Sequence, residues 1–274
     1  MGDWTGILRL DAEERSGKTV AGNVYFQGAF KVMRPVYHDH SGQACYYILN
    51  PGGGYLDGDR YQMKISLREG ARLTLTTQSA TKIYKTPNRP AYQETEIILK
   101  KGSYLEYIAD PLIGYKNARY KQKTAIRMEK GASLLYSEIV TPGWSPDGEQ
   151  FSYDCLQFVN EIYVDEELAV YDHIKLNPAE QPMHAIGVME GCTHMGSMMV
   201  VHDRIDQDFL DRLYNELQQA PGPVRFGMSL LPIPGLMLRV LGRSTQSIES
   251  MHSACHRWIG GELFGTTPSF LRKY

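Results

Sequence analysis

The sequence of 274 residues has no long apolar run and no excess of charge of either sign. No stretch approaches the about 18 consecutive apolar residues that a membrane-spanning helix needs. Its 29 basic residues nearly balance its 31 acidic ones, for a formal charge of -2. Because no overall field would attract a polyanion or an anionic surface, we expect neither nucleic acid nor membrane among its partners.

Common catalytic and metal-binding motifs are also missing. The segment Gly17-Lys18-Thr19 lacks the upstream glycine of a phosphate-binding loop, and no G-x-S-x-G, H-E-x-x-H or G-x-G-x-x-G is present. No C-x-x-C pair occurs, which argues against a zinc ribbon. The four cysteines are far apart: Cys45, Cys155, Cys192 and Cys255. We expect a reduced cytoplasmic protein that is not an enzyme.

A weak internal repeat is the clearest pattern that is present. A turn of charged residues followed by glycine occurs in Arg68–Leu73, Lys100–Leu105 and Glu129–Leu134, with the glycines 32 and then 29 residues apart. Glycine accepts the positive φ that such a turn requires. A looser fourth copy, Val164–Leu168, follows without its glycine. The repeat predicts turns of one kind at regular spacing.

Each of the three glycine turns lies between two segments of β-forming residues. The pairs are Tyr61–Leu67 with Leu73–Thr77, Thr95–Leu99 with Tyr104–Ile108, and Thr124–Met128 with Leu134–Val140. A repeat near 30 residues is typical of stacked layers that bury their apolar faces on one another. The fold is therefore predicted to be mainly β, a β-helix-like stack of short strands in layers. An ordinary sandwich whose hairpins look alike remains the alternative.

Two α-helices are expected near the C-terminus. The segment Asp206–Gln219 has an apolar stripe at intervals of four, and Ser247–Phe264 has a second stripe that includes Cys255. Between them, Met228–Val240 is β-like but interrupted by prolines. Since no flexible linker separates these parts, we predict a single domain over residues 1–274. It would have a β-rich part, 1–202, and a helix-containing part, 203–274.

Three clusters with histidine could hold a metal ion: His38 with His40, Cys192 with His194, and His252 with Cys255 and His256; Asp57 with Asp59 is a fourth cluster, of carboxylates, but lacks the spacing of an EF-hand. The first pair would share one face of a strand, but an exposed loop is the simpler interpretation. The second lies among methionines, which commonly fill gaps in cores. The third has its members one helical turn apart, and we interpret both histidines as helix-edge residues that flank a buried Cys255. All three are weak metal candidates.

Several blocks, in order, resemble one known family. The segment Asn50–Arg60 resembles its Pro-Gly-Gly block followed by Gly-Asp, and Leu75–Tyr84 resembles its next conserved segment. The residues that match are Pro51, Gly52, Gly53, Gly58, Asp59, Lys82 and Tyr84. The end of the chain, Pro268–Tyr274, is similar to tails of Gram-positive members. Together these blocks resemble the UreD (also called UreH) family of urease accessory proteins.

The resemblance implies a protein that binds urease apoprotein and a helical accessory partner, UreF, which recruits the nickel GTPase UreG. It also implies a β-helix-like stack with two helices, through which a water-filled tunnel passes nickel toward the urease active site. No tightly bound cofactor is expected, only transient Ni²⁺. A nickel-binding storage protein and an acid/base enzyme that uses Asp59 and Glu138 are the alternatives.

A conduit for nickel needs weak, exchangeable oxygen ligands, because tight nitrogen or sulfur ligands would trap the ion. The candidates along the path are Asp59, Thr77, Ser79, Thr81, Glu138 and Asp172. By the resemblance, Asp59, Glu138 and Asp172 match family positions thought to line the tunnel. The simpler interpretation of each carboxylate is a turn or surface residue, since Asp-Gly, as in Asp57-Gly58, is a strong turn signal.

Overall fold

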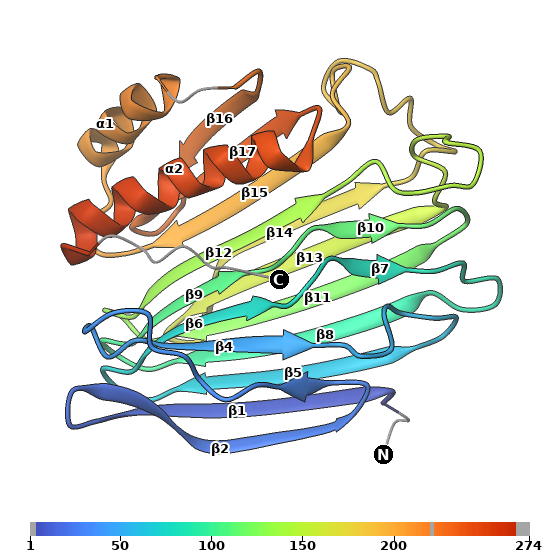
Figure 1. Ribbon diagram of the computed structural model, residues 1–274. Coiled ribbons are helices and arrows are strands. Elements are labelled where there is room, and N and C mark those ends of the chain that lie inside the picture. The colour runs from blue at the N-terminus through green and yellow to red at the C-terminus, as the bar shows by residue number, and fades with distance from the viewer. Residues whose placement is uncertain (1–3, 220–221, 267–274) are drawn as a thin grey trace.

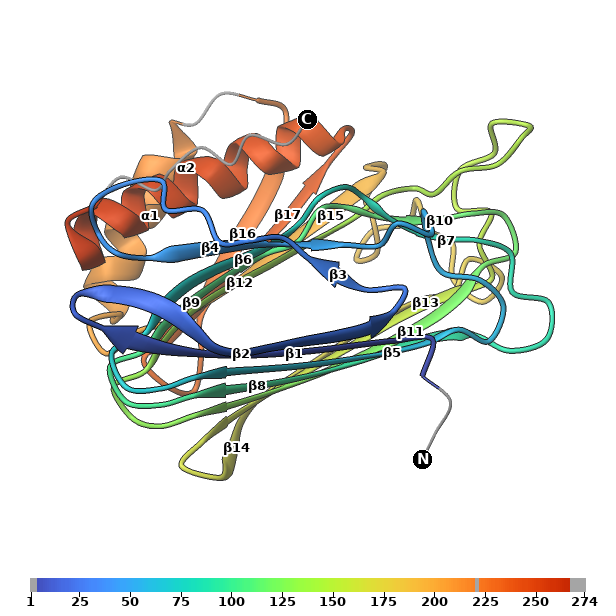
Figure 2. The ribbon, with the colours of Figure 1, turned by 60° about the horizontal axis from the view of Figure 1, so that its bottom comes forward.

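A computed structural model describes residues 4–219 and 222–266 of the chain, which form two β-sheets and two α-helices (Figure 1). Sheet A has seven strands in the order β14 (Glu167–Leu176), β13 (Cys155–Val164), β11 (Arg119–Met128), β8 (Ala91–Leu99), β5 (Arg60–Leu67), β1 (Gly6–Arg15) and β2 (Lys18–Gly28). Figure 2 shows it as the lower of two facing layers. The family-like tail Pro268–Tyr274 lies outside the described residues.

Sheet B is the facing layer and is covered by the helices. Its main path runs β16 (Arg225–Leu230), β17 (Gly235–Gly242), β15 (His194–Val201), β12 (Ser133–Val140), β9 (Tyr104–Ile108), β6 (Arg72–Thr77), β4 (Ala44–Leu49) and β3 (Lys31–Val32). Two short strands lie off this path: β7 (Thr81–Ile83) and β10 (Leu112–Gly114). Figures 1 and 2 show sheet B between sheet A and the helices, so the protein has three layers.

The central part of the chain coils between the two sheets. It passes from β5 to β6, from β8 to β9 and from β11 to β12, so that successive coils place parallel strands side by side in each sheet. The turn glycines Gly70, Gly102 and Gly131 all have positive φ, between 70° and 82°. Only glycine adopts such angles without a steric penalty from Cβ. The predicted β-helix-like stack of layers is thereby confirmed.

The looser fourth copy of the repeat, Val164–Leu168, does not continue the coil. Strands β13 and β14 form an antiparallel hairpin within sheet A, and its turn has Asp165 and Glu166 at φ 48° and 69°. The chain turns back beside the strand it has just completed instead of crossing to sheet B. A second antiparallel hairpin, β1 with β2, forms the other end of sheet A.

Both predicted helices are present. Helix α1 (Gln207–Gln218) is capped by Asp206, whose carboxylate accepts a hydrogen bond from the Phe209 backbone N–H at 2.9 Å. Helix α2 (Thr245–Phe264) is capped by Ser244 and ends at Gly265 in the left-handed conformation. Among the described residues, no helix is long and apolar enough to cross a membrane.

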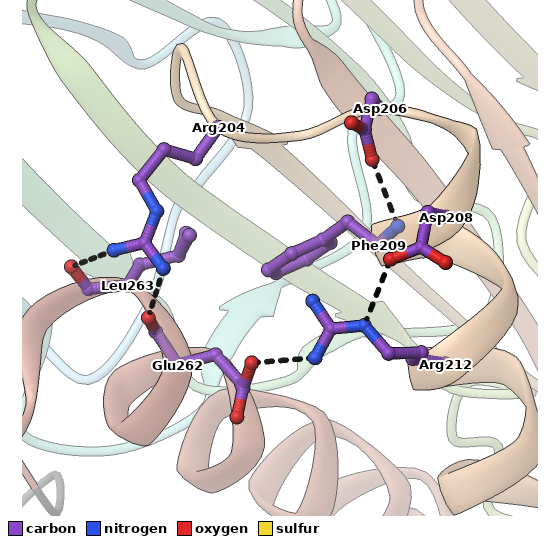
Figure 3. A network of polar contacts seen from close by, with 7 residues as sticks. All are labelled: Arg204, Asp206, Asp208, Phe209, Arg212, Glu262 and Leu263. Atoms are coloured by element: carbon purple, nitrogen blue, oxygen red, sulfur yellow. Dashed lines mark hydrogen bonds and ion pairs between the residues drawn. The ribbon is translucent and has the colours of Figure 1, made fainter.

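A polar network holds the two helices together (Figure 3). The Arg212 guanidinium on α1 contacts the Glu262 carboxylate on α2 at 2.7 Å and Asp208 on its own helix at 3.2 Å. Arg204 donates to the backbone carbonyl oxygens of Glu262 and Leu263, at 2.8 and 3.4 Å. The helical layer is thus linked internally, while its apolar face packs on sheet B.

Side chains alternate between the two faces of sheet B, and they therefore contribute to two separate hydrophobic cores. One lies between the inner faces of sheets A and B, and the other lies between the outer face of sheet B and the helices. Inner positions of a strand follow a period of two, so a polar residue at such a position must point into the protein. Such residues on β8, β11, β12 and β13 define the candidate site.

Candidate polar path between the sheets

A cavity of about 50 Å³ lies between the two sheets. One water needs about 10–15 Å³ on this measure, so the cavity has room for more than one. Its polar lining residues are Tyr55, Thr77, Thr81, Gln93, Tyr107, Asp110, Tyr120, Gln122, Tyr136 and Glu138. Of the six path candidates from the sequence, this set includes Thr77, Thr81 and Glu138.

Glu138 on β12 is the buried carboxylate at this cavity. Its Oε1 accepts hydrogen bonds from the Tyr136 hydroxyl at 2.9 Å and from the Gln122 side-chain amide, and its Oε2 accepts one from Asn160 Nδ2 at 3.0 Å. Burial raises the pKa of Glu138, these three bonds lower it in part, and the nearby charge of Asp172 raises it further. All three donors are neutral groups.

Uncharged polar groups extend this site across sheet A toward β5. Gln122 accepts a hydrogen bond from the Tyr120 hydroxyl at 3.0 Å, and its partner in the strand register on β8 is Gln93. Gln93 accepts from the Tyr55 hydroxyl at 2.6 Å and donates to Thr95 at 3.3 Å. Because strands β8 and β11 are adjacent, these side chains form a polar line that crosses the strands.

At the opposite end of the line, Asp172 on β14 forms an ion pair with Arg239 on β17. Asp172 is also the register partner of Asn160, which in turn donates to Glu138. The line therefore continues from Glu138 through Asn160 to Asp172. Asp172 is largely buried, with 15% of its side chain exposed, so the surface-carboxylate interpretation does not apply to it.

Of the path candidates in the segment from Thr77 to Thr81, the two threonines lie in different surroundings from Ser79. The Thr77 hydroxyl donates to Asp110 Oδ2 at 2.8 Å and accepts from the Asp110 backbone N–H at 2.8 Å. Thr77 and Thr81 line the cavity, whereas Ser79 is exposed and is not among the lining residues. The segment forms part of the wall through these two threonines.

Asp59 is held in a turn. Its carboxylate accepts hydrogen bonds from the Leu56 backbone N–H at 2.7 Å, from the Tyr61 hydroxyl at 3.1 Å and from the Thr5 hydroxyl at 3.1 Å. It does not line the cavity. The turn interpretation therefore describes Asp59 best, and its partners are separate from those of Glu138.

The family-like block around Asp59 is a structural turn that docks on β7. The Tyr55 backbone N–H donates to the Lys82 carbonyl at 2.7 Å, and the Tyr84 hydroxyl reaches the Gly53 carbonyl at 3.4 Å. A Cβ at Gly54 would lie 2.6 Å from the Lys82 carbonyl oxygen, so only glycine fits there. The other matched residues, Pro51, Gly52 and Gly58, belong to the same turn.

The first two clusters lie where the simpler interpretations place them, one in an exposed loop and the other among core residues. His38 and His40 are exposed outside the named strands. Cys192 is buried near Met189, and His194 is half-buried, with its pKa lowered by burial. Within residues 4–219 and 222–266, no group of three or more His, Cys, Asp or Glu side chains is placed to hold a metal ion.

The interpretation of His252 and His256 as helix-edge residues was wrong. His252 is buried against Gly196 on β15, and burial lowers the pKa of this imidazole to about 4. His256 contacts the buried carboxylate of Glu106 on β9 at 2.9 Å. Burial also raises the pKa of the Cys255 thiol to about 12. Helix α2 presents a wider buried face than its apolar stripe predicts, because it packs on sheet B and on α1.

Several residues of the polar line were absent from the sequence-based candidates, among them Gln122, Asn160 and Arg239. Gln122 and Asn160 both occupy inner positions of their strands. The other inner positions of β13 are apolar, whereas β11 also has Thr124 at an inner position. That break in the alternation was a usable signal. Arg239 breaks the pattern in the same way, because Met237 and Leu241 on the same face of β17 are apolar, but its partner on the opposite sheet could not be predicted from the sequence.

The fold and site define a class: a coiled two-sheet β protein, with helices on one sheet and a line of polar side chains between the sheets. The model of the family described as UreD urease accessory protein matches residues 5–273. The chain therefore belongs to the UreD family of urease accessory proteins, which confirms the resemblance seen in the sequence.

Three similar proteins each bear the name urease accessory protein UreD. The one from Lachnoclostridium phytofermentans is 48% identical over 274 residues, which is 100% of both chains. The one from Bacillus sp. (strain TB-90) is 44% identical and covers 98% of this chain and 99% of its own. The one from Staphylococcus saprophyticus is 42% identical and covers 99% and 98%.

Proposed function

We propose that this chain is a cytoplasmic scaffold that binds urease apoprotein and the UreF–UreG complex and passes Ni²⁺ between them along the polar line. Its membership of a family of urease accessory proteins supports a role in urease maturation. The observation that carries the proposed path is Glu138, a buried carboxylate whose three donors are all neutral. Ni²⁺ is cargo in this proposal.

The chemistry of the line suits an ion that must move on. Carboxylate, amide and hydroxyl oxygens bind Ni²⁺ less firmly than imidazole or thiolate, so an ion can pass from one to the next. A buried carboxylate has a large desolvation cost that an incoming cation would relieve. Neutral donors can rotate away without leaving a second charge unpaired. Glu138 is therefore suited to brief contact with a cation.

The test compares Glu138, which points between the sheets, with a glutamate on the outer face of sheet A. Glu138→Gln removes the interior charge but keeps the shape of the side chain. Glu161→Gln on β13 is the matched control, because Glu161 lies on the outer face of sheet A and pairs with Lys123 at 3.3 Å. Each variant would be co-expressed with the urease subunits and the other accessory proteins, and nickel per urease active site would be measured by mass spectrometry.

We expect Glu138→Gln to lower the nickel content on the order of tenfold, as removal of groups that support a metal site does. Co-purification of the variant with UreF and urease should remain normal. Glu161→Gln should load urease as the wild type does. Full loading with Glu138→Gln in an intact complex would show that the ion does not use this carboxylate.

A further inference from the structure

Two rows of side chains face each other near the end of the polar line. In sheet B, the register places Glu138, Ser197 and Arg239 in one row across β12, β15 and β17. In sheet A, Asn160 and Asp172 are register partners on β13 and β14. The rows meet twice: Asn160 donates to Glu138 at 3.0 Å, and Arg239 donates to Asp172.

The contact between Arg239 and Asp172 differs from the other ion pairs of the described residues. It joins the inner faces of the two sheets. Other ion pairs join neighbouring strands, turns or helices, and they lie outside the core between the sheets. The side chains of Arg239 and Asp172 are 31% and 15% exposed. The guanidinium pairs with Asp172 alone, and Asp172 in turn lies close enough to Glu138 for its charge to raise the pKa of that glutamate.

Unpartnered polar atoms gather at this same place. Asn160 Oδ1, Asp172 Oδ2 and Arg239 Nη1 are buried and have no hydrogen-bond partner among the described residues. A buried acceptor without a partner costs about 1–3 kcal/mol. Two of the three atoms are oxygens of the kind that coordinate a divalent cation. The two unpartnered oxygen atoms of this site are therefore suited to coordinate a cation.

We infer that Asn160, Asp172 and Glu138 form a transient station for a divalent cation, and that Arg239 is the displaceable counter-ion that occupies it between transfers. The inference rests on the proposed function for the direction in which the ion moves. Arg239 neutralises the charge of Asp172 while the station is empty of cargo. When Ni²⁺ arrives, the guanidinium leaves Asp172, and it returns when the ion moves on.

This arrangement explains why a buried pair of carboxylates need not retain nickel. Without Arg239, the two carboxylates would bind a divalent cation with nothing to compete for them. With Arg239 present, its ion pair with Asp172 must break each time Ni²⁺ binds, and it forms again each time the ion leaves. Arg239 therefore weakens binding and speeds release, so it is a positioning residue for the cargo rather than a ligand.

The experiment measures Ni²⁺ binding to the purified full-length chain by isothermal titration calorimetry, with Ni²⁺ alone as the probe. Arg239→Met should bind Ni²⁺ at least about tenfold more tightly than the wild type, because a positive charge a few ångströms from the ion has been removed. Arg239→Lys keeps the charge and should stay near the wild type. The double change Arg239→Met with Asp172→Asn should lose the gain. The control is Arg212→Met, in the helical network.

Unchanged Ni²⁺ affinity in a folded Arg239→Met protein would overturn the inference and leave Arg239 as a structural link between the sheets. A second measurement does not depend on that variant folding. In the wild type, Ni²⁺ should broaden the nitrogen-15 side-chain signal of Arg239, assigned with Arg239→Lys, and leave that of Arg212 sharp. Binding of Ni²⁺ without any change at Arg239 would equally overturn the inference.

Failure of this inference and failure of the proposed function are distinguishable. If Arg239→Met binds Ni²⁺ no better but Glu138→Gln leaves urease under-loaded, the route stands and the counter-ion role is wrong. If Arg239→Met binds Ni²⁺ more tightly but Glu138→Gln loads urease fully, the station exists and the route to urease is wrong. The first readout needs only this chain, and the second needs the whole assembly.

Discussion

Sheet B contributes one buried carboxylate to each of the two cores, and the two differ in their partners. Glu138 on β12 points between the sheets and accepts hydrogen bonds from Gln122, Tyr136 and Asn160. Glu106 on β9 points toward helix α2 and contacts the His256 imidazole at 2.9 Å. One carboxylate is surrounded by neutral groups, and the other has a titratable base beside it.

This difference moves the two pKa values in opposite directions. Burial would raise the pKa of Glu106, but the hydrogen bond and charge of His256, with further bonds from Thr74 and Tyr104, bring it below the usual value. Burial keeps the pKa of Glu138 above its usual value despite three hydrogen bonds. Glu106 thus links helix α2 to sheet B, whereas the hydrogen-bond partners of Glu138 are all neutral.

Removal of the histidine partner should have the largest effect on stability. His256→Ala removes the imidazole from the buried Glu106 carboxylate and leaves it with neutral donors such as Thr74 and Tyr104, and the loss of one member of a buried pair typically costs about 3 kcal/mol. Arg257→Ala is the matched control, because Arg257 is the exposed neighbour on the same helix. Urea unfolding monitored by circular dichroism would give both free energies. Equal, small losses for the two variants would remove the contrast between the two carboxylates.

A bulky residue at the cavity should act on nickel transfer rather than on the fold. Thr81→Trp would place an indole against the cavity, whereas Ser79→Trp places one on the exposed side of the same segment. Overpacking costs about 1–3 kcal/mol, so the fold and the binding of both partners must be verified first. We expect under-loaded urease with Thr81→Trp and normal loading with Ser79→Trp and Thr81→Ala.

Nickel per urease active site is again the measurement, on complexes purified intact. The Ser79→Trp protein controls for the general effect of an added indole in this segment. Full loading by the Thr81→Trp protein would mean that Thr81 does not border the route. The contrast between the two cores would then concern stability alone.

The smallest expected effect is on the pH dependence of stability, with opposite signs for the two glutamates. Glu106 has a lowered folded pKa, so its contribution is present above its unfolded pKa of about 4.3 and is lost as pH falls through the folded value. Glu138 has a raised folded pKa, so its contribution is present below about pH 4.3 and is lost as pH rises through the folded value.

Glu106→Gln should therefore lower the free energy of unfolding at pH 7, and the difference from the wild type should shrink only as pH falls below about 4.3. Glu138→Gln should raise the free energy of unfolding at pH 7 relative to the wild type, and this difference should shrink as pH falls toward about 4.3. Urea titrations from pH 7 down to below the folded pKa of Glu106 would measure both. Parallel profiles for the two variants would contradict the opposite pKa shifts.

The repeat shows how far local patterns can predict the fold. The glycine turns at Gly70, Gly102 and Gly131 were readable because a positive φ is a property of the local backbone. The looser copy at Asp165 and Glu166 has a similar charged turn but closes a hairpin. Which sheet the chain enters after a turn depends on the strand that is free to pair with it.

Helix α2 shows that local patterns also predict the burial of side chains only in part. Its period placed Cys255 correctly in the buried stripe, because that residue lies at the centre of the apolar arc. The burial of His252 and the contact of His256 were missed, because the width of the buried arc depends on how many neighbours cover the helix. In this protein both sheet B and helix α1 do so.

The sequence by itself determined the three glycine turns with the strands on either side of them, the two helices and the family, because each depends on local geometry or on an ordered set of motifs. Only the tertiary structure decided the partners of the charged groups. Glu106 meets His256 across 150 residues of sequence, and Asp172 meets Arg239 across 67. Such meetings depend on strand register and on the stacking of whole layers, which no local preference encodes.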